Sequence, residues 1–104
     1  MADGNGVRWI DNANERRYEL WIEDVRAGLT TYALAPGEIT FLHTEIEPEY
    51  QGRGWAGWLA VAMLDDARQR HLVVHPRCPF IRSYIVRHPE YADIVAPGFD
   101  LNAH

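Results

Sequence analysis

The first half of the chain alternates between apolar and polar residues, a pattern typical of strands that bury one face. The clearest example is the stretch 17–23, in which Tyr18 and Leu20 fall on the same face. Turn-forming residues, including the stretch 24–28, separate the alternating segments. Because these connections are short, we expect an antiparallel meander. The predicted strands cover residues 7–10, 17–23, 29–35 and 38–46.

The second half of the chain has the spacing of helices. After a loop at 48–54, small and apolar residues recur every three or four positions from 55 to 70, which predicts an amphipathic helix. A short apolar run at 72–74 predicts a buried strand. A second helix is predicted over 79–88, because proline suits the first helical position and a further proline follows the helix.

These elements have the order β-β-β-β-α-β-α, followed by a last turn at 91–95. A strand, a helix and a strand in succession form a right-handed crossover between parallel strands, so the predicted sheet is mixed. The fold class is α/β, in the broader α+β sense. At 104 residues the chain has the length of one domain. We expect its core at about 7–95, with loose ends that include residues 1–6.

The charge composition argues against several classes of function. The formal net charge is -5, and all ten basic residues are arginine. An acidic chain is a poor general binder of nucleic acid or membrane surfaces, so neither is expected as a partner. No apolar run approaches the roughly 18 residues of a membrane span. The N-terminal residues lack the features of a signal peptide, so we expect a cytoplasmic protein.

Cysteine and histidine give no sign of a metal site. The chain has one cysteine, Cys78, which cannot form an internal disulfide. His71, His75 and His88 have no metal-ligand spacing with one another or with this cysteine. We expect His71 and His88 to close helices, where positive charge is favoured, and we expect no bound metal.

The loop before the first predicted helix has the features of an anion site. Gly52 and Gly54 lack Cβ atoms, so an anion can approach the backbone closely. The N–H groups at the helix N-terminus are unpaired there, and Arg53 adds a mobile positive charge. This combination favours a phosphate or pyrophosphate. The alternative is a plain strand-to-helix turn in which the glycines only cap the helix.

The sequence Gln51-Gly52-Arg53-Gly54-Trp55-Ala56 resembles the acyl-CoA pyrophosphate loop, [QR]-x-x-G-x-[GA], of the GCN5-related N-acetyltransferases (GNAT). Residues from about 16 to 95 are similar to the minimal, YjdJ-type branch of that superfamily. The segments that carry this wider resemblance are 43–46, 51–54, 78–80, Tyr84 and 87–91.

The resemblance implies a splayed, mixed sheet with acetyl-CoA between the fourth and fifth strands. The pyrophosphate would lie on the backbone amides of residues 51–56. The pantetheine amides would pair with the strand edge near Ile46, like an added strand. A backbone N–H near Thr44 is the candidate oxyanion donor. An amine acceptor would then attack the thioester directly, in a ternary complex.

Four residues are candidates for proton transfer or nucleophilic catalysis. By resemblance, Tyr84 would protonate the leaving CoA thiolate, although it could equally be a core tyrosine. Cys78 precedes a helix N-terminus, a position that favours a reactive thiolate, so an acyl-cysteine step is conceivable; the alternative is a small buried residue. His43 and Glu45 are two apart on a strand and share a face, as a base relay would need. The alternative for this pair is a solvated contact on an exposed face.

The acceptor and the oligomeric state follow less directly from the sequence. The acidic chain favours a cationic amine, either a small molecule or a protein tail. A monomer or weak homodimer is expected. Arg77, Arg82 and Arg87 could meet the CoA 3′-phosphate or be ordinary surface charges. Two other functions stay open, namely a non-catalytic CoA-binding or protein-interaction module and an acidic scaffold with a chance glycine turn.

Overall fold

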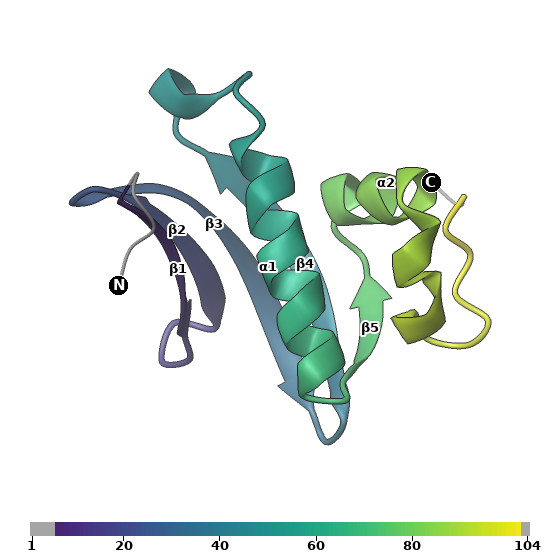
Figure 1. Ribbon diagram of the computed structural model, residues 1–104. Helices are drawn as coiled ribbons and strands as arrows, with labels where there is room; N and C mark the ends of the chain where they lie inside the picture. The colour runs from purple at the N-terminus through teal and green to yellow at the C-terminus, as the bar shows by residue number, and fades with distance from the viewer. Residues whose placement is uncertain (1–5, 103–104) are drawn as a thin grey trace.

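A computed structural model describes residues 6–102 and confirms the predicted order of elements (Figure 1). Residues 1–5 lie outside the described part, so the expected loose N-terminal end falls almost wholly outside it. Between residues 6 and 102, no helix is both long and apolar enough to cross a membrane. The elements are β1 (Val7–Asn12), β2 (Arg17–Ile22), β3 (Val25–Ala35), β4 (Glu38–Ile46), η1 (Pro48–Tyr50), α1 (Trp55–Gln69), β5 (Val73–Pro76), α2 (Pro79–Arg87) and η2 (Pro89–Ile94).

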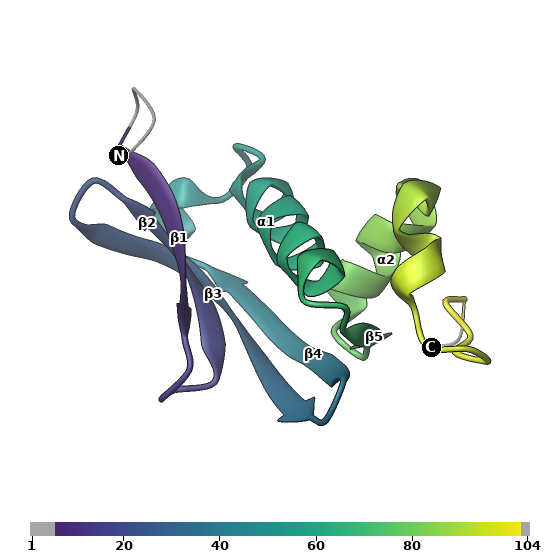
Figure 2. The same ribbon diagram turned by 60° about the horizontal axis from the view of Figure 1, so that its bottom comes forward.

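The five strands form one mixed sheet in the order β1-β2-β3-β4-β5. The first four are antiparallel neighbours, and β5 lies parallel to β4 after the crossover through α1. Helix α1 packs across the sheet, and α2 packs against β4 and β5 (Figures 1 and 2). The buried core between sheet and helices consists mainly of Tyr18, Leu20, Ile39, Phe41, Leu59, Met63, Leu64, Val74, Ile81 and Ile85.

Several predicted boundaries differ from the structure; β1 extends to Asn12 and β5 to Pro76, and the largest difference is at the start of β3. Residues 24–28 were expected to form a turn, but β3 already begins at Val25, and only Glu23 and Asp24 turn the chain. Glu23 adopts a left-handed φ of 54°, which closes this tight turn. Gly28 lies within strand β3. A larger residue would not fit there, because a Cβ would lie 2.6 Å from the side chain of Ile46. This glycine serves the close approach of β4 rather than a turn.

A β-bulge in β4 decides which side chains face the helices. Tyr32 pairs with Phe41, but Thr31 pairs with His43, so Leu42 is the extra residue. Each extra residue shifts the alternation of faces by one. After the bulge, Thr44 faces the helices, where its hydroxyl lies 3.3 Å from Cys78 Sγ at the start of α2.

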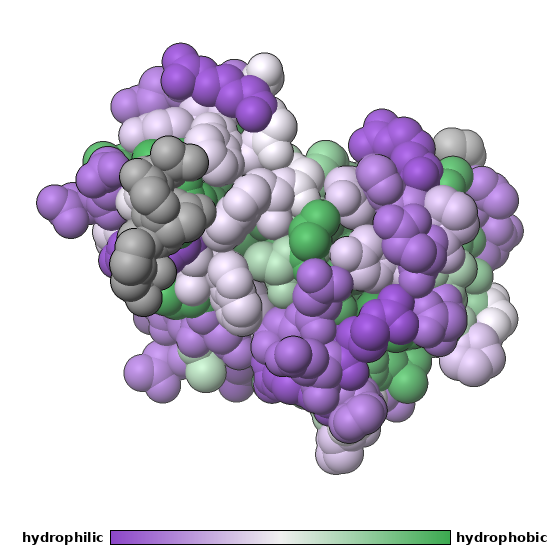
Figure 3. Space-filling model, viewed as in Figure 1, coloured by the Kyte–Doolittle hydropathy of each residue, from purple (hydrophilic) through white to green (hydrophobic). Residues whose placement is uncertain are grey.

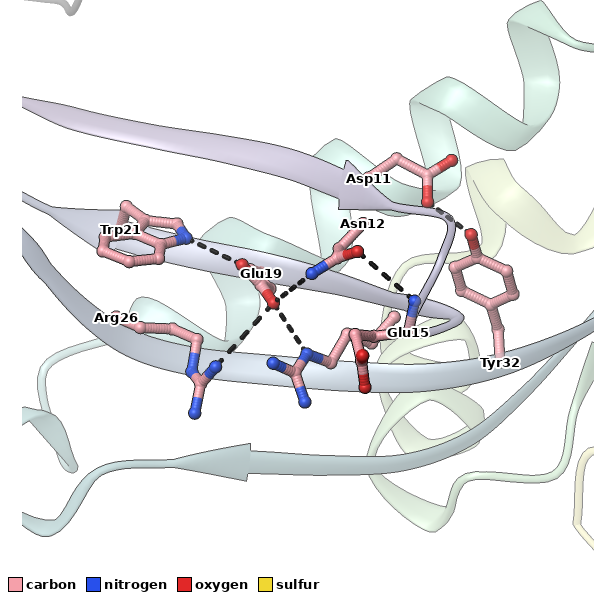
Figure 4. Close-up of polar contacts among 8 residues, drawn as sticks. Asp11, Asn12, Glu15, Glu19, Trp21, Arg26 and Tyr32 are labelled. Atoms are coloured by element: carbon pink, nitrogen blue, oxygen red, sulfur yellow. Dashed lines mark hydrogen bonds and ion pairs between the residues drawn. The ribbon is translucent and has the colours of Figure 1, made fainter.

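The sheet face away from the helices buries one carboxylate. Glu19 is 2% exposed, and it accepts hydrogen bonds from Arg17 Nε (2.7 Å), Trp21 Nε1 (2.9 Å) and Asn12 Nδ2 (3.1 Å) (Figure 4). The Arg26 guanidinium is 3.9 Å away. Burial alone would raise the pKa of Glu19, but the donated hydrogen bonds outweigh it and hold the pKa below its usual value. This cluster ties β1, β2 and β3 together.

A second polar cluster attaches the C-terminal end of α1 to the strands. Tyr18 donates a hydrogen bond to Asp66 of α1 at 2.6 Å, and Tyr32 donates one to Asp11. The Arg70 guanidinium bonds to both carboxylates, at 3.1 Å to Asp66 and 3.2 Å to Asp11. With this end of α1 fixed to the sheet, the helix N-terminus is held at the opposite end, next to the glycine loop.

Candidate active site

The glycine loop forms a sharp entry into α1. Gly52 and Gly54 have φ values of 77° and 83°, a left-handed conformation that favours glycine. A Cβ at either position would meet no protein atom within 4 Å, so both positions face open space. Gly54 is the N-cap residue of α1 and supplies no side-chain hydrogen bond to the helix. The first N–H groups of α1 are therefore available to a ligand in front of the loop.

A cleft of about 370 Å³ opens between this loop and α2. It corresponds to the notch at the top of the space-filling view (Figure 3). Its walls come from the end of β4, from the loop with the first turn of α1, and from one face of α2. The lining residues are Ile46, Tyr50, Gln51, Gly52, Gly54, Trp55, Ala56, Gly57, Phe80, Tyr84 and Arg87.

The charge of the cleft differs from that of the chain. Fifteen Asp and Glu residues give the chain its acidic balance, yet among residues 6–102 none lines this cleft. Arg87 is the one charged residue of this described part that does. Arg53, predicted to add positive charge to the loop, is exposed and does not line the cleft. An acid-free cleft beside a helix N-terminus suits an anionic ligand.

Two tyrosines in the cleft have free hydroxyl groups. Tyr18, Tyr32 and Tyr91 each donate a hydrogen bond to an aspartate. Within residues 6–102, the hydroxyls of Tyr50 and Tyr84 have no hydrogen-bond partner, and both residues line the cleft. Tyr50 is not among the residues predicted from the sequence, although its position next to the glycine loop is a signal that could identify it.

The environment of Tyr84 keeps its phenol protonated. Its ring stacks on His88, with centroids 4.1 Å apart and an interplanar angle of 22°. Burial, followed by the negative charges of Glu90 and Asp65, raises the pKa of Tyr84 above its usual value, against a smaller opposing effect of Arg87. At neutral pH this residue is a proton donor facing the cleft.

The strand edge near the cleft is open where β4 and β5 separate. Their last paired residues are Phe41 and Pro76, and beyond them β4 continues while the chain turns into α2 (Figure 1). Glu47 N–H donates to a carbonyl of β3 at 2.8 Å, so by alternation the backbone groups of Thr44 and Ile46 point toward the open side. The Ile46 carbonyl accepts a hydrogen bond from Gln51 Nε2 at 2.9 Å.

Cys78 lies at the point of separation and is buried, with 2% of its surface exposed. It is the N-cap residue of α2, and its backbone N–H donates to the Phe41 carbonyl at 2.8 Å. Its Sγ is 3.3 Å from Thr44 Oγ1, which in turn is 2.8 Å from Thr30 Oγ1. The thiol is therefore one end of a buried chain of hydroxyl groups and does not line the cleft.

His43 and Glu45 lie on the other side of the sheet. His43 Nε2 and Glu45 Oε2 are 3.0 Å apart, and both side chains are more than 60% exposed. Glu45 is opposite Leu29, which is opposite Glu19 on the face away from the helices. The pair lies on the part of β4 that continues beyond the last β4–β5 pair, Phe41 and Pro76.

The structure thus brings six of the eight predicted cofactor-binding residues and Tyr84 together in one cleft. The other candidates do not line it; they are Thr44, Arg53, Cys78, His43 and Glu45. Among residues 6–102, no group of three or more His, Cys, Asp and Glu residues is placed to hold a metal ion. The residues that share the cleft are Ile46, Gln51, Gly52, Gly54, Trp55, Ala56 and Tyr84.

Comparison with known proteins explains this arrangement. A family model described as GCN5-related N-acetyl-transferase matches residues 17–94. The chain belongs to the GCN5-related N-acetyltransferase family. The matched segment contains the whole cleft and every predicted catalytic residue. Family membership identifies the chain as an N-acetyltransferase, and this family generally uses acetyl-CoA.

This N-acetyltransferase is similar in sequence to vertebrate proteins and similar in fold to a solved bacterial structure. Protein NATD1 of Mus musculus is 37% identical over 101 residues, which cover 93% of this chain and 92% of the relative. The Gallus gallus protein of the same name is 37% identical over 57 residues, or 53% of this chain and 52% of the relative. The solution structure of a GCN5-like candidate N-acetyltransferase from Staphylococcus aureus has a TM-score of 0.69 and 22% identity, with 98% of each chain covered, and confirms the fold.

Proposed function

We propose that this N-acetyltransferase moves an acetyl group from acetyl-CoA to an amine by direct attack within a ternary complex. The observation that carries the proposal is the acid-free cleft in front of the α1 N-terminus, in a chain of net charge -5. A cleft without acidic lining in an otherwise acidic chain favours an anionic ligand. Acetyl-CoA supplies the activated acyl group as a thioester.

The residues present fit this cosubstrate. The open positions in front of Gly52 and Gly54 leave room for a pyrophosphate against the backbone amides of residues 51–56. The Thr44 backbone groups and the Ile46 N–H offer an open strand edge to the pantetheine amides, while the Ile46 carbonyl already accepts a hydrogen bond from Gln51 Nε2. Tyr50, Trp55 and Phe80 give the cleft an apolar lining suited to the rest of the chain.

Residues of this chain can meet the demands of the reaction. Formation of the new C–N bond and cleavage of the C–S bond require an oxyanion donor, an acid for the sulfur and an acceptor for the amine proton. We assign the oxyanion role to the Thr44 backbone N–H, which points toward the open side of β4. Tyr84 donates its proton to the departing sulfur. Glu45, hydrogen-bonded to His43, takes the proton lost from nitrogen on the outer face.

Direct attack is preferred to an acyl-cysteine step. Cys78 is 2% exposed and its thiol already contacts Thr44 Oγ1, so a nucleophilic role would require movement of the start of α2. The acceptor that suits the outer face is a cationic amine, either a small molecule or a protein tail. The exposed Glu45 carboxylate and the net negative charge favour such a molecule electrostatically.

A binding and turnover experiment tests the proposal. We expect acetyl-CoA and CoA, but not ATP at equal concentration, to raise the melting temperature. We expect CoA release from acetyl-CoA when a panel of cationic amines is added, followed with a thiol reagent. Absence of stabilisation by either CoA species would contradict the proposal. Stabilisation without transfer to any amine would instead favour the alternative, a non-catalytic CoA-binding or protein-interaction module.

A further inference from the structure

Arg87 lines the cleft and has no ion-pair partner among residues 6–102. It lies in the last turn of α2 and is exposed. Other arginines form ion pairs with carboxylates. In the sheet, Arg17 pairs with Glu19, and in α1, Arg68 pairs with Asp93. The Arg87 guanidinium is therefore available to bind an anionic group of a ligand in the cleft.

Position selects Arg87 among the arginines near the cofactor loop. Arg77, Arg82 and Arg53 also have no ion-pair partner in the described part of the chain. None of these three lines the cleft, and Arg87 does. The sequence alone did not separate the three arginines between residues 77 and 87.

The spacing along α2 places Arg87 at the outer end of the cleft. Phe80, Tyr84 and Arg87 are separated by four and three residues, so they form one stripe on the helix, and all three line the cleft. Cys78, the N-cap residue of the helix, contacts Thr44 where β4 and β5 separate. With a rise of about 1.5 Å per residue, the Arg87 backbone lies roughly 13 Å beyond that point.

The two walls of the cleft therefore present different kinds of anion site. The loop wall offers backbone amides at the α1 N-terminus, which suit the pyrophosphate. The α2 wall offers one guanidinium at the outer end, whose planar donors match a phosphate monoester. A ligand bound across both walls must carry two separate anionic groups, and CoA does, as a pyrophosphate and a ribose 3′-phosphate.

We propose that Arg87 binds the 3′-phosphate and makes the cleft select CoA over dephospho-CoA. This inference rests on the proposed function, because it requires CoA to occupy the cleft. Arg87 is here a specificity-determining residue and takes no part in acyl transfer. A charge-assisted contact of this kind predicts that the wild-type chain binds CoA about tenfold more tightly than dephospho-CoA.

A double comparison of ligand and variant tests this assignment. Dissociation constants for CoA and dephospho-CoA are measured by isothermal titration calorimetry on the wild-type chain, Arg87→Gln and the control Arg77→Gln. We expect Arg87→Gln to weaken CoA binding about tenfold and to change dephospho-CoA binding less than twofold. Arg77→Gln, an exposed arginine outside the cleft, should preserve the wild-type preference. The ratio of the dephospho-CoA and CoA dissociation constants of Arg87→Gln should thus approach one.

Three results would overturn the assignment, and they are distinguishable. Equal weakening of both ligands by Arg87→Gln would mean that Arg87 meets the pyrophosphate. Equal binding of both ligands by the wild-type chain would mean that the 3′-phosphate is not recognised, while the proposed function stands. Binding of neither ligand would overturn the proposed function and this inference together. Because Arg87 is exposed, circular dichroism and melting curves are expected to show an intact fold for the variant.

Discussion

Substitution of Gly54 by alanine separates backbone strain from ligand contact. Gly54 has a φ of 83°, and an alanine in this left-handed conformation costs about 1–2 kcal/mol. For a chain of this length, that cost lowers the melting temperature by roughly 4–8 °C per kcal/mol. Gly37, at the β3–β4 turn, has a φ of 73° and faces open space in the same way. Gly37→Ala is therefore a matched control for strain outside the cleft.

The two variants should differ only in cofactor binding. The new Cβ at position 54 projects into the space in front of the loop amides, where we place the pyrophosphate. Loss of hydrogen bonds to a charged group predicts about 10- to 100-fold weaker binding of CoA by Gly54→Ala, measured by calorimetry. Gly37→Ala should bind CoA as the wild-type chain does. Equal CoA affinity in both variants, with equal loss of melting temperature, would refute the placement of the ligand on this loop.

Three further predictions concern the acid, the cysteine and the buried carboxylate. Tyr84→Phe keeps the ring stacked on His88 but removes the phenol, so kcat for CoA release should fall about 100-fold with an unchanged KM for acetyl-CoA; an unchanged kcat would exclude Tyr84 as the acid. Cys78→Ser should retain turnover, and mass spectrometry should find no acetyl adduct on the wild-type chain during turnover; an adduct together with an inactive variant would establish the acyl-cysteine route. Glu19→Gln should lower the free energy of unfolding by about 1–3 kcal/mol at pH 7. Because folding lowers the pKa of Glu19, its ionised carboxylate stabilises the fold above the unfolded pKa of 4.5, and this stabilisation is lost as the pH falls below that value. Denaturant titrations should therefore show a smaller loss of stability in acid for Glu19→Gln than for the wild-type chain. Identical acid profiles of the two chains would contradict this.

The strand pattern and the loop motif were predictable from the sequence because both are local. Alternation in residues 17–23 reports one buried face directly, and the glycines of the loop report a sharp helix entry. The prediction for Gly28 is wrong because a glycine in a turn and a glycine beside a closely packed neighbouring strand look alike without the partner strand. The burial of Glu19 was equally hidden, since the pattern shows only that it faces away from the helices, while the covering Arg17 and Trp21 side chains depend on strand pairing.

The candidate site was predictable only in part. The loop residues and Tyr84 share one cleft, although 33 positions separate Gln51 from Tyr84 in the sequence. Which arginine lines that cleft depends on how α2 is rotated, and no periodicity in the sequence reports this for Arg87. Tyr50 was missed because its significance lies in a hydroxyl without a partner, which appears only when every other contact is known.

The bulge at Leu42 has a kinetic consequence. By shifting the alternation of β4, it turns Thr44 toward the helices while His43 and Glu45 face outward. Under the proposed function, the sheet would then separate a donor side from an acceptor side. The two substrates would meet only at the gap between β4 and β5, each through its own entrance. Neither then blocks the path of the other, so either can arrive first and either product can leave first. The proposed function together with the extra residue at position 42 therefore predicts initial-rate kinetics of random order, whereas a compulsory order of substrate binding would contradict this placement of the two substrates.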